Sequence, residues 1–137
     1  AGYRQPTLVN ELDGARQLLE AAGVVCVIEQ STEDLSPVLE IILAWTVREG
    51  VTNVIRHSRA RQCVIRLARD QGMVEVILLN DGALQEDQQD KRANQGSGLP
   101  GLQERVAALG GTMEACLLDR SGKKHFRLRV TLPLQMA

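Results

Sequence analysis

Two spacings of hydrophobic residues alternate along the chain and predict its helices and strands. Apolar residues three or four positions apart, with start or stop signals at the ends, are typical of helices. This pattern marks residues 10–22, 37–58 and 99–109. Apolar residues at every second position, or short β-branched runs, are typical of strands. They mark residues 24–29, 62–69, 74–79, 112–118 and 127–132.

Local signals at the ends of these segments support the prediction. Ser36 precedes Pro37 at the start of the longest helix, and Gly23 follows the first helix as a stop. Residues 70–72 read Asp-Gln-Gly between two strands, which is typical of a hairpin turn. Residues 81–95 are almost wholly polar and have little apolar surface to bury, so we expect a mobile segment there.

The order of these elements predicts the fold class. Strand pairs and helices are both present, but strands and helices do not alternate regularly as they do in a parallel α/β sheet. We therefore expect an α+β, two-layer α/β sandwich. Its sheet is expected to be mixed and mostly antiparallel, with helices on one face and solvent on much of the other.

Composition limits the size and the class of the protein. The chain has 137 residues, of which 44% are hydrophobic and 24% charged, and this suits one globular domain. The formal net charge of −1 gives no overall basic field for binding nucleic acid or an anionic membrane. No apolar run approaches the roughly 20 residues of a membrane-spanning helix, so direct insertion of this segment is not expected.

The cysteines do not form a metal-binding pattern. Cys26, Cys63 and Cys116 are far apart, and each lies in an apolar stretch without a Cys-x-x-Cys or Cys/His cluster. The pattern favours buried, reduced thiols in a cytosolic protein.

A polar stripe on the longest helix is the first candidate for chemistry. Glu49, Asn53 and His57 are four residues apart and therefore share one helix face, with Arg56 beside them. A glutamate can orient a nucleophile, an asparagine carbonyl oxygen is a hard ligand suited to Mg²⁺, and the bases can meet phosphate charge. The same stripe is also compatible with a simple solvated face whose charges complement the helix dipole.

Two glycine-containing turns are the other candidates. Asn80-Asp81-Gly82 ends a strand, where an amide or carboxylate can hydrogen-bond a base edge, although such a triplet is often an ordinary turn. Residues 96–102 read Gly-Ser-Gly-Leu-Pro-Gly-Leu and open a helix, where backbone N–H groups and the helix dipole favour phosphate. This turn is neither a Walker A loop nor a dinucleotide-binding fingerprint.

Taken in order, the three motifs resemble those of the GHKL ATPase superfamily, and most closely those of the DesK-type sensor histidine kinases. The N box of that family reads roughly Glu-x-x-x-Asn-x-x-Arg/Lys-His-Ser, which residues 49–58 match in full. Its first glycine box, usually Asp-x-Gly, corresponds to residues 80–82. Its second, Gly-x-Gly-Leu-x-Gly-Leu/Met-x-Glu-Arg, is matched by residues 96–105. The resemblance spans nearly the whole chain and implies the ATP-binding sandwich fold of that family, with a flexible lid.

The resemblance also implies a role for each matched residue. Glu49 would polarise the group that attacks the γ-phosphate, and Asn53 would coordinate Mg²⁺. Arg56 and His57 would contact phosphate or ribose, and Asn80 would read adenine. The implied ATP-binding positions are Asn53, Arg56, His57, Asn80, Asp81, Gly82, Gly96, Gly98, Leu99, Gly101 and Leu102.

The chain departs from the family pattern at two places. The adenine-reading position is normally Asp, and here it is Asn80, whose amide can still accept from and donate to the base; Asp81 is an alternative reader after a one-residue slip. The last strand of the family often opens with Gly-Thr near the phosphates, and His125 and Phe126 stand at those positions here.

The resemblance further implies that the ATP-binding site and the phosphoacceptor histidine lie on different domains. Residues 1–9 are expected to be a linker from a dimerisation and phosphoacceptor hairpin outside this chain, and residues 10–137 the ATP-binding catalytic domain. Neither His57 nor His125 is a phosphoacceptor candidate by the resemblance. The expected partners are therefore ATP or ADP, the histidine-bearing domain of the same kinase, and indirectly a response regulator. The expected location is the cytoplasmic part of a membrane-anchored bacterial receptor.

Two other functions fit parts of the same pattern. One is a GHKL serine kinase of the anti-sigma-factor type, and the other is a degenerate nucleotide-sensing module without catalysis. The Arg-His-Ser ending of the N box and the Gly-Leu-Pro-Gly-Leu-Gln-Glu-Arg stretch favour the histidine kinase. Retention of Glu49 and Asn53 counts against a degenerate module.

Overall fold

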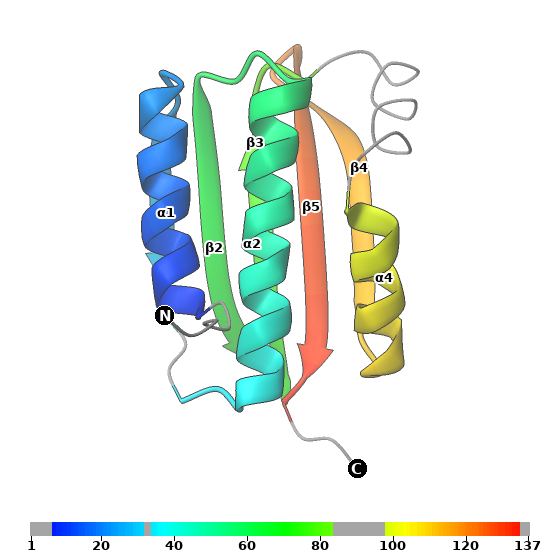
Figure 1. Cartoon of the computed structure of the whole chain (residues 1–137). Coiled ribbons are helices and arrows are strands. Elements are labelled where there is room, and N and C mark those ends of the chain that lie inside the picture. The colour runs from blue at the N-terminus through cyan, green and yellow to red at the C-terminus, as the bar shows by residue number, and fades with distance from the viewer. Residues whose placement is uncertain (1–6, 32–33, 84–97, 135–137) are drawn as a thin grey trace.

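The computed structural model describes residues 7–31, 34–83 and 98–134, and in these ranges three helices cover one face of a five-stranded sheet (Figure 1). This is the two-layer sandwich that the order of the elements predicts. The elements in chain order are α1 (Leu8–Ala21), β1 (Val25–Gln30), α2 (Pro37–His57), β2 (Gln62–Asp70), β3 (Met73–Asn80), α4 (Leu99–Ala108), β4 (Thr112–Arg120) and β5 (Lys123–Pro133).

The sheet is mixed and mostly antiparallel, as predicted. Its strands lie in the order β1-β2-β3-β5-β4, and only β1 and β2 are parallel. Parallel neighbours need a long crossover, and α2 supplies it. The two hairpins turn at Gln71-Gly72 and Ser121-Gly122, where all four residues have positive φ between 51° and 78°. Such two-residue turns match the twist of paired strands.

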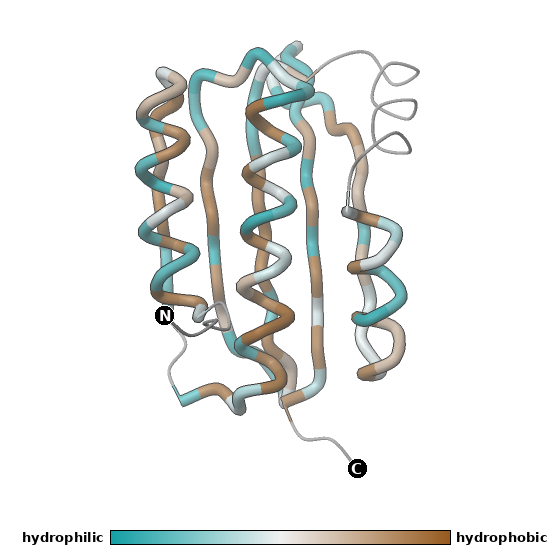
Figure 2. The backbone as a smooth tube through the Cα atoms, viewed as in Figure 1, coloured by the Kyte–Doolittle hydropathy of each residue, from teal (hydrophilic) through white to brown (hydrophobic). Residues whose placement is uncertain are grey.

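The core lies between the helices and the sheet and is almost wholly aliphatic. Inward positions alternate along the central strands, and Figure 2 shows brown hydrophobic positions alternating with teal ones there. The helices add fully buried leucines to the same layer, and α1 packs on β1, α2 on β3 and β5, and α4 on β4. Among the fully buried side chains are Leu19, Leu43, Leu78, Leu102 and Leu128.

Side-chain caps fix where the first two helices begin. Ser36 Oγ accepts a hydrogen bond from the Leu39 N–H at 3.4 Å, as its position before Pro37 indicated. Thr7 Oγ1 accepts from the Asn10 N–H at 3.2 Å, so α1 begins two residues before the predicted start. The sequence pattern missed this because Thr7 was not recognised as a cap, and Leu8 is in fact buried in the core.

The second hairpin is longer than predicted. Strand β4 continues to Arg120 and β5 begins at Lys123, whereas alternation in the sequence ended the first at residue 118 and started the second at 127. Lysine and aspartate side chains near the turn hide the alternation, but the tight turn keeps the ladder paired to its end. The expectation of three buried thiols also needs correction: Cys26 and Cys63 are buried, but Cys116 is only partly buried because it lies on the edge strand β4.

Helix α2 lies unusually close to the sheet beside the first motif. A Cβ atom at Gly50 would lie 2.7 Å from a methyl carbon of Leu78 on β3, and 3.2 Å from one of Leu128 on β5. A glycine at this position therefore permits the close contact. The contact fixes the depth at which the neighbouring Glu49 is held above the sheet.

Candidate functional site at the α2–α4 junction

The polar face of α2 carries the first part of the site. Glu49 and Asn53 lie one helical turn apart on this face, and Glu49 is partly buried. Asn53 is only 5% exposed, and its Oδ1 atom has no hydrogen-bond partner. A buried acceptor without a partner is costly unless something else binds it. In the last turn of the helix, Arg56 is exposed and His57 is partly buried.

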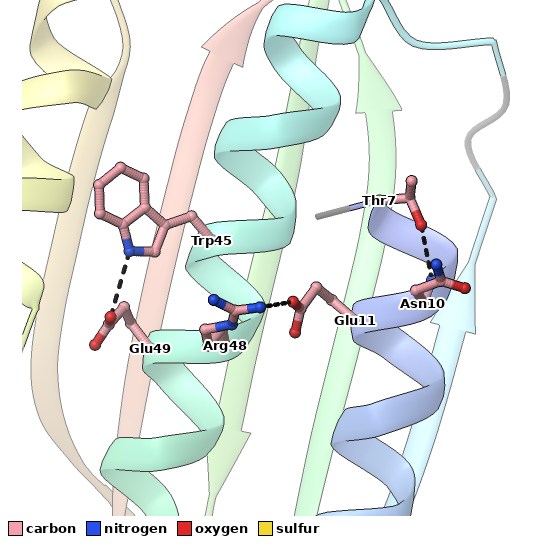
Figure 3. A network of polar contacts seen from close by, with 6 residues as sticks. All are labelled: Thr7, Asn10, Glu11, Trp45, Arg48 and Glu49. Carbon is pink, nitrogen blue, oxygen red and sulfur yellow. Dashed lines mark hydrogen bonds and ion pairs between the residues drawn. The ribbon is translucent and has the colours of Figure 1, made fainter. Parts of the chain in front are cut away.

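The carboxylate of Glu49 joins α2 to the beginning of α4. Its Oε1 accepts a hydrogen bond from Trp45 Nε1 at 3.3 Å, and its Oε2 accepts one from the Gly98 N–H at 3.1 Å. Figure 3 shows Trp45 and Glu49 on the side of α2 that faces α4, whereas Arg48 points toward α1 and pairs with Glu11. The acid predicted from the N box and the turn predicted from the second glycine box are therefore in direct contact.

The N-terminus of α4 is suited to an anion. Gly98 is its N-cap residue, no side chain of its own segment caps it, and its N–H points at the Glu49 carboxylate. The N-terminal end of a helix favours negative charge because unpaired N–H groups and the helix dipole are directed there. A Cβ at Gly98 would overlap the Glu49 carboxyl group, so a larger residue there would shift the Glu49 side chain from its observed position.

The other residues of the second glycine box divide by position. Leu99 and Leu102 are 5% and 0% exposed, so they anchor α4 in the core. Gly101 is exposed in the first turn of α4. Gly96 and most of the polar segment predicted to be mobile lie outside the described residues.

Asn80 ends β3 in a buried position. It is 2% exposed, and in the sheet it lies between Cys63 on β2 and Phe126 on β5. Its Nδ2 atom donates to the Asp81 carbonyl oxygen at 2.7 Å. The position after Asn80 is also where the strand ladder gives way to a turn.

Asp81 and Gly82 hold this turn against the chain that leaves α2. Asp81 Oδ1 accepts hydrogen bonds from the Arg61 and Gln62 N–H groups at 2.8 and 3.0 Å. Gly82 has a φ of +64°, and a Cβ there would overlap the Arg59 carbonyl. The Arg59 N–H in turn donates to the Gly82 carbonyl at 2.9 Å.

A basic pocket of about 360 Å³ opens beside this turn. It is lined by Arg59, Arg61, Asp81, Gly82, Ala83, Lys123 and Lys124. The four cationic residues come from the loop after α2 and from the start of β5, which are far apart in the chain, so their meeting was not visible in a sequence whose net charge is −1. Of the two residues that replace the family's Gly-Thr, His125 is partly exposed and Phe126 is buried in the core.

The residues present fit a magnesium ion that is also bound by a nucleotide. The Asn53 oxygen is a hard donor, buried and without a partner, as a cation ligand should be. Within the described residues, no group of three or more His, Cys, Asp or Glu side chains could hold a metal ion alone. Magnesium commonly keeps few protein ligands and takes the rest of its oxygens from substrate phosphates and water.

Burial sets the chemistry of two of the thiols. Desolvation raises the pKa of Cys63 to about 12, with the neighbouring Cys26 and Asp81 adding to the effect. Burial also raises the pKa of Cys26. Both groups are therefore neutral side chains of the core at neutral pH.

Solved structures with the same architecture define the class of protein. The histidine kinase domain of the blue-light activated kinase EL346 from Erythrobacter litoralis aligns over 98% of this chain and 66% of its own length, with a TM-score of 0.72 and 18% identity. The catalytic domain of histidine kinase ThkA aligns over 100% of both chains, with a TM-score of 0.65 and 16% identity. The fold is that of a histidine kinase catalytic domain.

Sequence relatives narrow the class. Sensor histidine kinase DesK from Bacillus subtilis is 31% identical over 108 residues, which are 77% of this chain and 29% of DesK. YvfT from the same organism is 29% identical over 133 residues, or 96% of this chain and 33% of YvfT. No protein-family model matches the chain. The chain is identified by these relatives as a catalytic domain of the DesK-type sensor histidine kinases, and it spans about a third of the length of the relatives that it matches.

Proposed function

We propose that the chain binds Mg²⁺-ATP between α2 and α4 and donates the γ-phosphate to a histidine on a separate dimerisation domain. The observation that carries this proposal is the unpartnered, buried Oδ1 of Asn53 beside a carboxylate that sits on the N-terminus of α4. One residue offers a cation ligand, and the helix end offers a place for phosphate.

Different residues of the chain have different roles around the phosphates. Asn53 ligates Mg²⁺, which when bound neutralises charge on the phosphate oxygens. The N–H groups at the start of α4, including that of Gly98, hold phosphate. Glu49 then accepts a hydrogen bond from the attacking imidazole of the acceptor and keeps it oriented toward the γ-phosphate. Arg56, in the last turn of α2, adds positive charge near the nucleotide, and His57 in the same turn contacts phosphate or ribose.

At the other end of the site, Asn80 is the better candidate than Asp81 for reading adenine. The Oδ1 atom of Asp81 already accepts two backbone hydrogen bonds, whereas the hydrogen bond from the Asn80 side chain to the Asp81 carbonyl uses Nδ2 and not the side-chain oxygen. An amide oxygen can accept from the adenine amino group. Gly82 then allows the turn to stay close to the loop after α2.

The acceptor histidine is proposed to come from outside this chain. Of its two histidines, His57 lies in the N-box helix, and the Nδ1 atom of His125 lies 3.2 Å from the Lys123 carbonyl. The relatives are sensor histidine kinases about three times as long as this chain. We therefore propose a cytoplasmic domain of a larger receptor that signals through a response regulator. In the described residues, no helix is long and apolar enough to cross a membrane.

Separating the roles of Glu49 and Asn53 tests this proposal. Glu49→Gln keeps the shape and removes the charge, so it should leave the affinity for nucleotide within about twofold. It should slow transfer by about 10²-fold, the lower end of the usual range for acid–base assistance. Asn53→Ala removes a metal ligand and should weaken both Mg²⁺-ATP binding and transfer. Binding is measured with a fluorescent ATP analogue, and transfer with the chain mixed with its histidine-bearing domain, or in the complete kinase.

Matched controls are available on α1. Glu11→Gln removes an equivalent charge that pairs with Arg48 on the side of α2 facing α1, and Asn10→Ala removes an exposed asparagine. Both controls should bind and transfer as the wild type does. If Glu49→Gln weakens binding as much as Asn53→Ala while bound ATP still turns over normally, the assigned roles are wrong.

A further inference from the structure

A tryptophan lies beside the acid of the proposed site. Trp45 precedes Glu49 by one turn of α2, and its indole N–H donates to the Oε1 atom of the carboxylate at 3.3 Å (Figure 3). It is the only tryptophan in the chain. Because the two residues are four positions apart on one helix, their backbone positions relative to each other are set by α2 alone.

The indole is held from the opposite helix as well. The guanidinium carbon of Arg105, on α4, lies 4.9 Å from the centroid of the Trp45 ring. A guanidinium at this distance over an indole is attracted by the negative face of the ring. Arg105 is the arginine that closes the second glycine box, so this contact also gives a structural reason for that position.

The two oxygens of Glu49 have unequal donors. Oε2 is bonded to the Gly98 N–H, at the end of α4 where a phosphate oxygen would compete for the same donor. Oε1 accepts its hydrogen bond from the Trp45 indole N–H, and a phosphate at the helix end does not compete for that donor. A phosphate oxygen bound at this helix end would therefore displace Oε2 and leave the bond between Oε1 and Trp45 in place.

We propose that Trp45, locked by Arg105, is a positioning residue that holds the Glu49 carboxylate in its working orientation once ATP has displaced it from α4. This inference rests on the proposed phosphotransfer function. A glutamate side chain has several rotatable bonds, and one retained charge-assisted hydrogen bond removes much of that freedom. The freed Oε2 is then the oxygen available to the acceptor histidine.

The single indole N–H allows the contact to be observed directly. In a ¹⁵N-labelled chain, Trp45 gives one indole signal, which should shift on Glu49→Gln because the charged acceptor is lost. Adding Mg²⁺ and a non-hydrolysable ATP analogue should leave the signal near its hydrogen-bonded position, while the Gly98 amide signal moves. If the chemical shift of the indole signal does not change in Glu49→Gln, the proposal is overturned.

Kinetics then separate positioning from packing. Trp45→Phe keeps an aromatic ring for Arg105 and removes only the N–H, so nucleotide affinity and the melting temperature should stay near those of the wild type. The rate of transfer from bound ATP should fall about tenfold, the factor expected for one hydrogen bond to a charged group. Arg105→Gln should give a smaller fall, because the indole is loosened but still present.

The control for a general helix effect is Leu18→Ala, which removes an exposed side chain from α1 (57% exposed) and should leave transfer unchanged. Normal transfer by Trp45→Phe, in a wild-type chain that binds Mg²⁺-ATP, overturns the positioning role alone. A wild-type chain that fails to bind Mg²⁺-ATP overturns the proposed function and this inference together. The two failures are therefore distinguishable in one set of measurements.

Discussion

At the scale of single residues, three buried polar side chains among the described residues differ in how they are satisfied. Thr46 donates to the Ile42 carbonyl of its own helix at 2.8 Å, and Asn80 donates to the Asp81 carbonyl at 2.7 Å. Asn53 has the same burial, but its carbonyl oxygen has no partner. Since buried polar atoms are normally paired, this exception supports the proposed role of Asn53 as a metal ligand.

The presence of Asn rather than Asp at position 80 has a consequence for stability. Asn80→Asp removes the donor to the Asp81 carbonyl and places a carboxylate at a position that is 2% exposed. We expect the free energy of unfolding at pH 7 to fall by about 1–3 kcal/mol. The loss should shrink at low pH, where the protonated carboxyl can donate again. Urea denaturation measures this.

Asn10→Asp is the matched control for that change. Asn10 is exposed in the first turn of α1, where negative charge is favourable, so the same substitution should be neutral or slightly stabilising. Equal losses of stability at positions 10 and 80 would contradict the role given to the Asn80 amide.

The thiols provide a second prediction at this scale. Burial raises the pKa of Cys63 to about 12, so at pH 8 almost none of it is thiolate, the reactive form. Cys116 is partly buried on an edge strand. Iodoacetamide at pH 8 should therefore label Cys116 first in the native protein, and Cys116→Ser should remove the fast phase in mass spectrometry. Labelling of Cys63 at the rate seen in urea would contradict the structure.

The motif residues could be identified from the sequence, but the side chains that contact and orient them could not. The spacing of Glu49 and Asn53 was sufficient to place both on one helix face, because helix periodicity is a local property. Trp45 carries no sign in the sequence that it donates to Glu49, and its contact with Arg105 joins residues 60 positions apart. Such a contact depends on how two helices pack, which the pattern of one chain does not specify.

At the scale of elements, the approach of α2 to the sheet is the feature that positions the site. Gly50→Ala would place a methyl group 2.7 Å from Leu78, which is itself 2% exposed and has little room to move. Alanine normally favours a helix over glycine, but overpacking should win here. We expect a loss of about 1–3 kcal/mol in the free energy of unfolding, measured by urea denaturation.

Gly14 in α1 gives the matched comparison. A Cβ there would meet nothing within 4 Å, so Gly14→Ala should stabilise the protein by about 0.5–1 kcal/mol through helix propensity alone. If Gly50→Ala stabilised the protein to the same extent, α2 would not lie as close to β3 and β5 as described.

The ends of the elements were predicted less well than their existence. Helix α2 carried both a cap and a proline at its start, and it begins at the predicted Pro37. The second hairpin carried lysines and an aspartate near its turn, and both of its strands extend beyond the predicted ends. Backbone pairing continues to a tight turn whatever the polarity of the side chains, so hydrophobic alternation underestimates such strands.

At the scale of the whole molecule, the order of elements predicted the two layers but not the arrangement of strands. No pattern of residues indicated that β5 lies between β3 and β4, an order that brings Phe126 beside Asn80 at the end of the sheet. The basic pocket has the same origin, because it joins the loop after α2 to the β4–β5 turn. The net charge of the chain is close to zero, so it gives no indication that cationic side chains are concentrated at this place.

Binding of a nucleotide together with Mg²⁺ at the junction of α2 and α4 is the proposal on which the other assigned roles depend. Its most direct test is calorimetric titration of the chain with ATP, in excess Mg²⁺ and again in EDTA. Because the unpartnered oxygen of Asn53 is assigned to the metal, binding should be clear with Mg²⁺ and should weaken markedly in EDTA. Asn53→Ala should remove most of the difference between the two conditions. No binding of ATP, or equal affinity with and without Mg²⁺, would contradict the account.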